Sequence, residues 1–270
     1  MGSGDLTTLA TIPADHPSVA DLVVRESCVV AGLVLLPLIA RIYADRSQGN
    51  SIEIADSVGD GSHLEAGAVA CRLHGDARSL LTLERTILNF VGGLSGIATL
   101  TERYVATVWE TGAKTRVLDT RKTTPGHREI EKYAVLCGGG SNHRMGLFDA
   151  VLIKDNHVAA AGGISAAVHA AIEQASDGVD IECECDTMEQ VSEALDAGAR
   201  AILLDNFTAA QAREAVAFVS GRARLEVSGG VSLETIAAYA QAGVDDVSVG
   251  RLTHSAVSID VSLELPLRVT

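Results

Sequence analysis

Positively charged side chains are concentrated between residues 114 and 154, and they are the first feature of this sequence that could do chemistry. The segment holds eight Lys or Arg residues against four Asp or Glu residues, whereas the rest of the chain holds thirteen against thirty-one. Arginine forks and lysine ammonium groups both bind carboxylates and phosphates. The overall net charge of −14 argues against a nucleic-acid-binding surface. The pattern therefore predicts an anionic small molecule as the ligand, with a solvated basic face as the alternative.

Acidic side chains accompany these cations at the ends of several β-rich runs. Glu182 and Glu184 lie two residues apart in one run, and Asp205 follows another. Carboxylates at this place could hold Mg²⁺, accept hydrogen bonds from sugar hydroxyls, or serve as counter-ions for nearby lysines. Cations that suit carboxylates and phosphates, together with carboxylates that suit a metal ion, favour a phosphorylated sugar as a substrate.

Two glycine turns complete this set of polar strand ends. The sequence Ser228-Gly229-Gly230 follows one β-rich run, and Gly250 follows the next along the chain. Glycine lets the backbone approach a phosphate closely, and free N–H groups at the start of a helix favour negative charge. A plain tight turn would need the same residues, but two such turns at successive strand ends favour a phosphate site.

Short β-rich runs alternate with helical segments through the second half of the chain. The predicted strands are residues 116–119, 150–153, 179–185, 201–204, 224–227 and 246–249. The predicted helices are residues 164–175, 188–197, 209–219 and 233–242. Apolar runs without alternation are typical of parallel strands covered by helices on both faces. The pattern predicts an α/β fold with a closed or nearly closed β/α barrel of about six or seven strands, whose polar strand ends meet on one face.

The first part of the chain has a different pattern, so we expect it to form a separate α+β domain. The runs that mix apolar strands with Gly-rich turns are residues 29–43, 51–55 and 68–73. Residues 80–90 have the apolar spacing of an amphipathic helix. We therefore predict one domain over residues 1–98 and a barrel domain over residues 99–253.

The five cysteines indicate neither a disulfide framework nor a metal site, because no Cys-x-x-Cys is present. Cys183 and Cys185 flank Glu184 and so share the opposite face of a strand, where buried packing explains them better than metal binding. Cys137 has no evident catalytic base beside it. We find no secretory signal and no apolar run long enough to span a membrane. These features predict a cytoplasmic protein without a membrane partner.

Six motifs in the chain are specific enough to compare with known families. They are residues 84–89 (ERTILN), 94–99 (LSGIAT), 119–126 (DTRKTTPG), 131–135 (EKYAV), 138–144 (GGGSNHR) and 152–157 (LIKDNH). Together they resemble the quinolinate phosphoribosyltransferase family, also called nicotinate-nucleotide pyrophosphorylase (carboxylating). The resemblance extends from residue 4 to residue 255, which is nearly the whole chain.

This resemblance implies a fold and a reaction. The fold would be an N-terminal α+β sandwich domain, to which residues 254–270 return, followed by an incomplete β/α barrel. Two copies would form a homodimer with shared active sites. The reaction would join quinolinate to phosphoribosyl pyrophosphate with Mg²⁺ as the cofactor. Its products would be nicotinate mononucleotide, pyrophosphate and CO₂, in the biosynthesis of NAD.

The motif matches also imply roles for individual residues. Those that would bind quinolinate are Arg121, His143, Arg144, Lys154 and, from the other subunit, Arg85. Those that would act as catalytic residues facing the pyrophosphate and the ribose are Lys122, Glu184 and Asp205. Glu184 and Asp205 would also hold the Mg²⁺. Those that would bind the 5′-phosphate are Ser228, Gly229, Gly230 and Gly250.

Three alternative functions are consistent with parts of the same pattern. A paralogous phosphoribosyltransferase would act on another heteroaromatic acid, although the intact set of quinolinate-binding residues argues against it. A Schiff-base aldolase would use Lys154, which follows a predicted barrel strand, to attack a carbonyl. A metabolite-binding protein without catalytic activity would keep the pocket but show no turnover.

Overall fold

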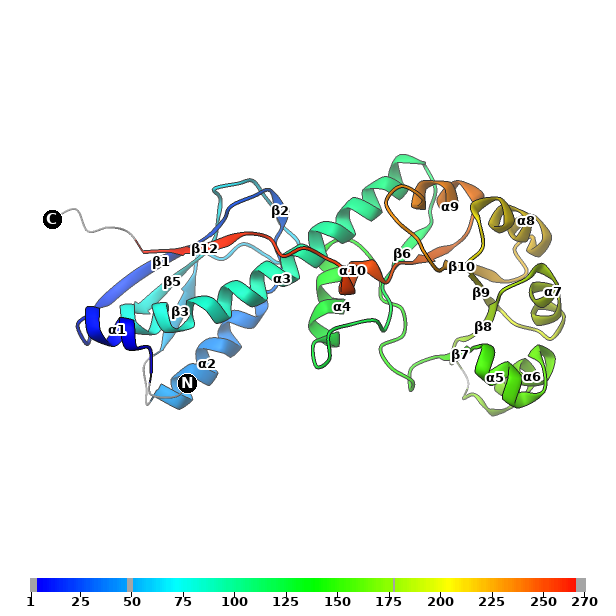
Figure 1. Ribbon diagram of the computed structural model, residues 1–270, viewed down its shortest axis with the longest axis horizontal. Coiled ribbons are helices and arrows are strands. Elements are labelled where there is room, and N and C mark those ends of the chain that lie inside the picture. Colours follow the sequence, from blue (N-terminus) through cyan, green and yellow to red (C-terminus); the bar gives the residue numbers. More distant parts are fainter. Residues whose placement is uncertain (1–3, 48–50, 177, 266–270) are drawn as a thin grey trace. The chain divides into compact units, whose positions relative to one another are not determined.

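The structure is a computed structural model, and it describes residues 4–47, 51–176 and 178–265. The chain divides into two compact units. The first holds the described residues up to 100, residues 136–139 and those from 256 onwards, and the second holds the remainder. A 34-residue helix, α3 (Ala77–Glu110), begins in the first unit and ends in the second (Figure 1).

The first unit is built on a four-stranded antiparallel sheet. Its strands, in order across the sheet, are β12 (Val261–Glu264), β1 (Pro17–Val24), β5 (Val69–Asp76) and β3 (Ile52–Ala55). The remaining elements of this unit are α1 (Leu6–Thr11), β2 (Cys28–Val29), η1 (Leu33–Leu35), α2 (Leu36–Ser47) and β4 (His63–Leu64). Because β12 pairs with β1, the sheet joins segments from near both ends of the chain.

The buried core of the first unit contains residues of the sheet and of the helices α2 and α3. Leu22 and Leu73 from the strands belong to one hydrophobic cluster with Leu36 and Leu80 from the helices, and each is at most 2% exposed. Burying a side chain of this size contributes about 1.5–3 kcal/mol. The unit is therefore a layer of helices on a sheet, which is the predicted α+β architecture.

Two details of the first unit differ from the sequence-based prediction. Residues 36–43, which we placed among the apolar strands, form most of α2, because Leu36, Ala40 and Tyr43 are buried at helical spacing. Strand β1 was not predicted, because Asp21 interrupts its apolar residues. The charge of Asp21 is paired across the sheet with Arg72, its register partner on β5.

Helix α3 contains the predicted helix 80–90 but continues through three glycines. Ideal Cβ atoms on Gly92 and Gly96 would lie 2.8 Å from the carbonyl oxygen of Ile259 and 2.1 Å from that of Val257. A Cβ on Gly93 would meet only Ser258 Oγ, at 4.0 Å. The glycines at 92 and 96 therefore let the segment before β12 cross the helix closely, which explains glycine inside a helix despite its low helix propensity.

We expect Gly96→Ala to lower the free energy of unfolding by about 1–3 kcal/mol, because the new methyl group would overlap the Val257 carbonyl. Gly93→Ala is the matched control, and it should stabilise the protein by up to about 1 kcal/mol through helix propensity alone. Urea unfolding followed by circular dichroism measures both. Equal stabilisation by the two substitutions would show that the backbone crossing is not tight.

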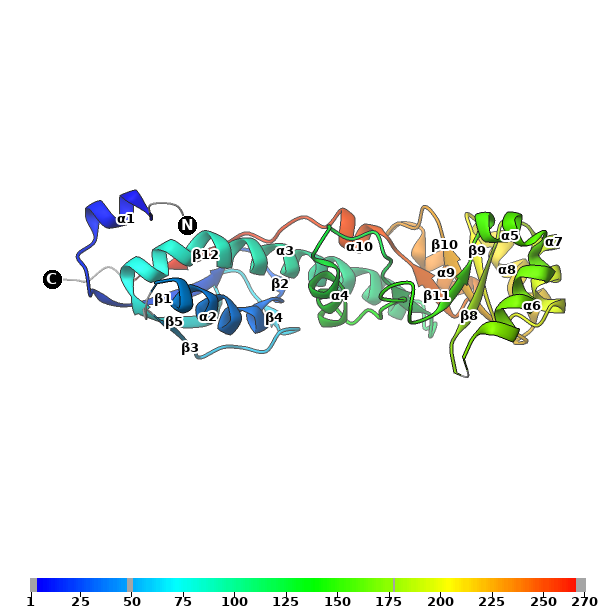
Figure 2. The same ribbon diagram turned by 90° about the horizontal axis from the view of Figure 1, so that it is seen from below.

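The second unit contains a parallel sheet of six strands flanked by helices (Figures 1 and 2). The strands in chain order are β6 (Arg116–Leu118), β7 (Val151–Ile153), β8 (Ile181–Cys185), β9 (Ala201–Asp205), β10 (Arg224–Ser228) and β11 (Asp246–Ser248). The helices are α4 (Arg128–Cys137), α5 (Asp155–Ala161), α6 (Ile164–Gln174), α7 (Met188–Asp196), α8 (Ala209–Val219), α9 (Ile236–Ala242) and α10 (Arg251–His254).

The strand order across this sheet is β6-β11-β10-β9-β8-β7. All neighbouring strands are parallel. The predicted α/β fold, an incomplete barrel of six or seven parallel strands, is confirmed, and the number of strands is six. Helices α4 and α5 were not predicted. Across the described ranges, no helix is both long and apolar enough to cross a bilayer.

Candidate active site

A cavity of about 390 Å³ lies at the carboxyl ends of the strands of the second unit. Its lining residues are Thr120, Arg121, Lys122, His143, Arg144, Leu152, Lys154, Glu184, Leu203, Asp205, Glu226, Ser228 and Ser248. All six strands, or the turns that directly follow them, contribute to it. This is the face on which β/α barrels carry their active sites.

Both arginines that line this cavity lack a carboxylate partner among the described residues. No ion pair within the described chain involves Arg121 or Arg144, and the buried Nε of Arg121 donates no hydrogen bond there. Burial lowers the pKa of Arg144, and the nearby positive charge of Arg121 lowers it further. An anionic ligand with carboxylate or phosphate oxygens would supply the missing counter-charge and hydrogen-bond acceptors.

A buried ion pair fixes the loop that carries His143 and Arg144. Asp119 follows β6 and pairs with Lys132 of α4, and both side chains are fully buried. Oδ1 of Asp119 also accepts the backbone N–H of His143 at 2.9 Å, and the side-chain amide nitrogen of Asn142 donates to Oδ2 at 2.6 Å. Burial raises the pKa of Asp119, and the hydrogen bond and charge of Lys132 oppose that rise.

We expect Lys132→Met to lower the free energy of unfolding by about 3–5 kcal/mol, because Asp119 would keep a buried charge without its partner. The double variant Asp119→Asn/Lys132→Met removes both charges and should recover most of this loss. Thermal and urea unfolding measure the effect. A single variant as stable as the parent protein would contradict an anchoring role for the pair.

Two carboxylates lie on the same rim as the cations. Glu184 forms an ion pair with Lys154. Burial raises the pKa of Asp205, the negative charge of Asp186 adds to that effect, and the charges of Lys154 and Lys122 oppose it. The rim therefore has a cationic part near the arginines and an acidic part near Asp205.

At the two predicted glycine turns, the loops that follow neighbouring strands pack close together. Gly229 has a left-handed backbone (φ 95°), and a Cβ there would lie 2.2 Å from Oδ1 of Asn206. The backbone N–H of Asn206 in turn donates to the carbonyl of Ser228 at 2.9 Å. A Cβ on Gly250 would lie 3.2 Å from Cδ of Lys122. Close packing and the left-handed backbone thus require glycine at 229, whereas at Gly250 the side chain of Lys122 is merely a close neighbour.

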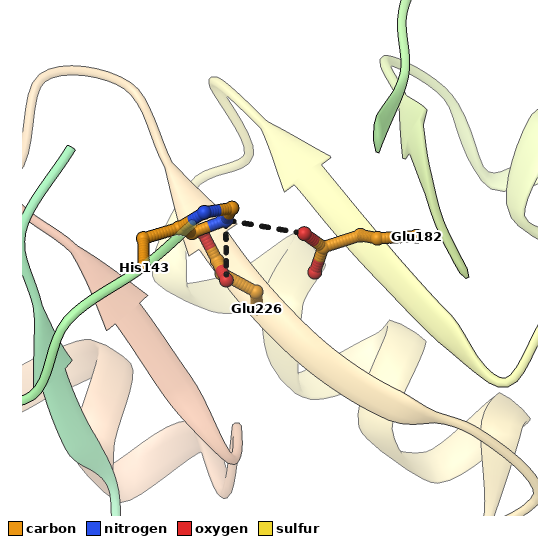
Figure 3. Close-up of side chains that lie close together, drawn as sticks. All are labelled: His143, Glu182 and Glu226. Atoms are coloured by element: carbon orange, nitrogen blue, oxygen red, sulfur yellow. Dashed lines mark hydrogen bonds and ion pairs between the residues drawn. The ribbon is translucent and has the colours of Figure 1, made fainter. Parts of the chain in front are cut away.

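His143, Glu182 and Glu226 form a buried group that we call the floor cluster (Figure 3). Nε2 of His143 lies 3.2 Å from Oε2 of Glu182 and 3.5 Å from Oε2 of Glu226. The glutamate side chains are 5% and 0% exposed. Nδ1 of His143 accepts the backbone N–H of Arg144 at 2.7 Å, and the hydroxyl of Ser248 donates to Oε1 of Glu226.

Two residues of the floor cluster, His143 and Glu226, have raised pKa values. Burial alone lowers the pKa of His143, but the hydrogen bond with Glu182 and the charges of both glutamates outweigh it and raise that pKa. Burial raises the pKa of Glu226 to about 8, with a further contribution from Glu182, while His143 and Ser248 act in the opposite direction. Glu226 therefore stays largely protonated at neutral pH.

This pKa predicts how Glu226 makes stability depend on pH. The folded protein keeps a proton on Glu226 between the ordinary glutamate pKa of 4.5 and about 8, whereas the unfolded chain releases it. Because the native state binds more protons in this window, the contribution of Glu226 to stability falls as pH rises. We expect Glu226→Gln to gain stability relative to the parent between pH 5 and pH 8. A pH-independent difference in urea unfolding would contradict this.

Comparison with known proteins gives the family. The model of the quinolinate phosphoribosyl transferase N-terminal domain matches residues 5–95, and that of the C-terminal domain matches residues 97–264. The chain belongs to the quinolinate phosphoribosyltransferase family.

The named relatives in this family cover nearly the whole chain. A nicotinate-nucleotide pyrophosphorylase [carboxylating] of Mycobacterium leprae is 44% identical over 97% of this chain and 91% of its own. A quinolinate phosphoribosyltransferase [decarboxylating] of Nicotiana tabacum is 39% identical over 97% of this chain and 77% of its own. The solved structure of the nicotinate-nucleotide pyrophosphorylase from Francisella tularensis has a TM-score of 0.90 at 39% identity, over 98% of this chain and 91% of that one.

The structure of this quinolinate phosphoribosyltransferase family member brings most of the predicted site residues together. Those that line the cavity are Lys122, Glu184, Asp205, Arg121, His143, Arg144, Lys154 and Ser228. Gly229, Gly230 and Gly250 are not lining residues but lie in the turns directly after lining strands. Arg85 is an exposed residue of α3 in the first compact unit.

Glu226 and Ser248 also line the cavity, but no role was predicted for either from the sequence. Each lies two residues before a predicted phosphate-binding residue, Ser228 or Gly250. Because side chains alternate along a strand, residues two apart share a face. This two-residue spacing from a predicted phosphate-binding residue was the sequence signal that could have identified Glu226 and Ser248 as site residues.

Proposed function

We propose that this chain transfers the phosphoribosyl group of phosphoribosyl pyrophosphate to quinolinate, with decarboxylation, and forms nicotinate mononucleotide and pyrophosphate in NAD biosynthesis. The observation that carries the proposal is one cavity that contains two unpaired guanidinium groups and a separate acidic rim. Quinolinate is a dianion, whereas phosphoribosyl pyrophosphate needs both phosphate contacts and a divalent cation. The two parts of the rim suit the two substrates.

Quinolinate would be bound at the cationic part of the cavity. Arg121 and Arg144 present forks that match carboxylate oxygens, and Lys154 offers a point charge. His143 lies beside them and is fixed through its hydrogen bonds to Glu182 and Arg144. Two anchored carboxylates would fix the orientation of the pyridine ring so that its nitrogen meets the anomeric carbon.

Phosphoribosyl pyrophosphate would lie on the acidic part of the rim and the glycine turns. Lys122 would face the pyrophosphate, and Ser228, Gly229, Gly230 and Gly250 would surround the 5′-phosphate. As pyrophosphate departs, positive charge develops on the ribose ring, and the carboxylates of Glu184 and Asp205 would stabilise it. Lys122 would offset the charge on the leaving group.

The residues at the acidic rim fit Mg²⁺. Glu184 and Asp205 provide oxygen ligands, and burial, with the negative charge of Asp186, raises the pKa of Asp205. Mg²⁺ is commonly bound by one or two carboxylates together with substrate phosphates. When bound, the ion would neutralise charge on the pyrophosphate.

We include a homodimer with shared active sites in this proposal, with Arg85 of one subunit reaching the quinolinate site of the other.

We also propose a cytoplasmic location without nucleic-acid or membrane partners. The support is the net charge of −14 and the five free cysteines, which suit a reducing compartment.

The direct test is to mix purified protein with quinolinate, phosphoribosyl pyrophosphate and Mg²⁺, and to measure nicotinate mononucleotide and CO₂. Nicotinate and other heteroaromatic acids serve as comparison substrates. Efficient use of another acid with no turnover of quinolinate would favour the paralogous transferase, and tight binding without turnover would favour a metabolite-binding protein.

The aldolase alternative is disfavoured by the ion pair between Lys154 and Glu184. A Schiff base needs the nitrogen of Lys154 free to attack a carbonyl, whereas here it is bonded to the carboxylate of Glu184. Borohydride trapping with candidate aldehydes should therefore fail to label Lys154.

A further inference from the structure

Glu226 lies between two cavities of the second unit. It lines the candidate active-site cavity and also a cavity of about 180 Å³ at the opposite ends of the strands. The second cavity is lined by residues at strand starts, including Arg116, Val151 and Arg224, and by the exposed Asp180. Glu226 therefore separates a substrate-sized space from a second space that extends towards solvent.

The floor cluster resembles a metal site in composition, but its hydrogen bonds argue against one. Nδ1 of His143 accepts the backbone N–H of Arg144, so the hydrogen of the neutral ring is on Nε2. Nε2 is the atom that faces both glutamates (Figure 3). A histidine that binds metal through Nε2 needs its hydrogen on Nδ1. The imidazole therefore donates to the carboxylate of Glu182 instead.

The same contacts identify which oxygen of Glu226 holds a proton. Oε1 accepts the hydroxyl of Ser248, whereas the buried Oε2 has no hydrogen-bond partner in the described protein. The charged groups around Glu226 are Glu182 on β8, Asp246 on β11 and His143 on the loop before β7. Two buried acids beside it favour the neutral form of Glu226, so the proton resides on Oε2.

The proposed reaction requires a proton at one ring carbon. When the carboxylate next to the ring nitrogen leaves as CO₂, the electron pair of the broken C–C bond stays on that carbon. The positive pyridinium nitrogen stabilises this pair, but the product carries hydrogen there. Guanidinium groups seldom give up a proton, because their pKa is too high. Lys154 is engaged with Glu184.

We propose that Glu226 is the acid that protonates this ring carbon, a role that rests on the function proposed above. The C–C bond breaks, CO₂ leaves, and the electron pair on carbon takes the proton from Oε2 as a C–H bond forms. Glu226 becomes a carboxylate, to which the Nε2–H of His143 and the hydroxyl of Ser248 can donate. Solvent then restores the proton through the second cavity, so no other reactant is needed.

The test compares Glu226→Gln with the parent protein by rapid quenching, using quinolinate with a labelled carboxylate. Pyrophosphate and CO₂ are measured separately. Because the amide matches the shape of the neutral acid, we expect a first turnover of pyrophosphate within about twofold of the parent. Release of CO₂ should fall by about 100-fold, which is typical for loss of a general acid. The N-ribosylated diacid should accumulate and incorporate label from added ¹³CO₂.

Controls separate this role from a structural one. Glu214→Gln on α8 changes an exposed carboxyl group that lines neither cavity, and it should not accumulate the diacid. Glu226→Asp keeps an acid and should recover part of the CO₂ release if Glu226→Gln folds poorly. CO₂ release by the parent should decline above about pH 8, the pKa of Glu226.

Two results would overturn the inference. Parallel loss of pyrophosphate and CO₂ in Glu226→Gln would show that Glu226 only shapes the site. Unchanged CO₂ release would show that a lysine or solvent supplies the proton. If the parent itself fails to convert quinolinate, the proposed function is wrong, which is a distinct outcome.

Discussion

Arg144→Ala is expected to lower kcat/KM for quinolinate by about 10²–10³-fold while the protein remains folded. Arg144 has no ion-pair partner in the described structure, and its guanidinium is partly buried beside Arg121. Removing one partner of a buried charge pair formed with a ligand costs about 2–5 kcal/mol. The loss should therefore appear with quinolinate and not in the stability of the free protein.

Steady-state kinetics with each substrate varied, together with thermal unfolding, check this result. Arg213→Ala on α8 is the matched control, because it removes an exposed arginine far along the chain from the cavity-lining segments. We expect a raised KM for quinolinate, little change in the KM for phosphoribosyl pyrophosphate, and a melting temperature no lower than that of the parent. Unchanged kinetics would contradict the placement of the diacid.

Mixing Arg85→Ala protein with Lys154→Ala protein is expected to restore activity that neither variant has alone. In the proposed dimer, each site takes Arg85 from one subunit and Lys154 from the other. A mixed dimer then contains one intact site and one doubly altered site. With random exchange, about a quarter of the parental activity should return.

Subunit exchange must be shown independently, for example with differently tagged variants recovered together. Mixing Arg144→Ala with Lys154→Ala is the control. In the proposed dimer, each site takes both Arg144 and Lys154 from a single subunit, so no mixed dimer of these variants can hold an intact site. Recovery in that control, or none in the test pair after confirmed exchange, would be incompatible with shared sites.

The barrel strands were predictable because each is a short apolar run between turn residues. The six predicted runs correspond to β6–β11, and the polar residues after them line one cavity. The topology itself brings the ends of parallel strands together, so residues such as Arg121, Lys154 and Asp205 could be grouped without knowledge of any side-chain contact.

The floor cluster could not be predicted in the same way. Glu226 lies within an apolar strand, and nothing in its local sequence shows that His143, more than eighty residues earlier, provides its hydrogen-bonding neighbour. The roles of Asp119 and Lys132 were hidden for the same reason. Buried charges depend on partners from distant segments, whereas strands depend on local patterns.

The full length of α3 could not be predicted from its local sequence either. The predicted helix ended at residue 90, before the glycines at 92, 93 and 96, yet α3 continues to Glu110. The reason lies in residues 257–259, whose carbonyl groups occupy the space that side chains would fill at two of these positions.

The pairing of β12 with β1 has a consequence for biosynthesis. During translation, β1 is made before the barrel, but its partner strand β12 is made only after every residue of the barrel. The first sheet therefore lacks its edge strand while the six barrel strands are being made. A truncated chain that ends shortly before residue 261 should hold all six barrel strands beside a sheet in which one edge of β1 is open to chaperones.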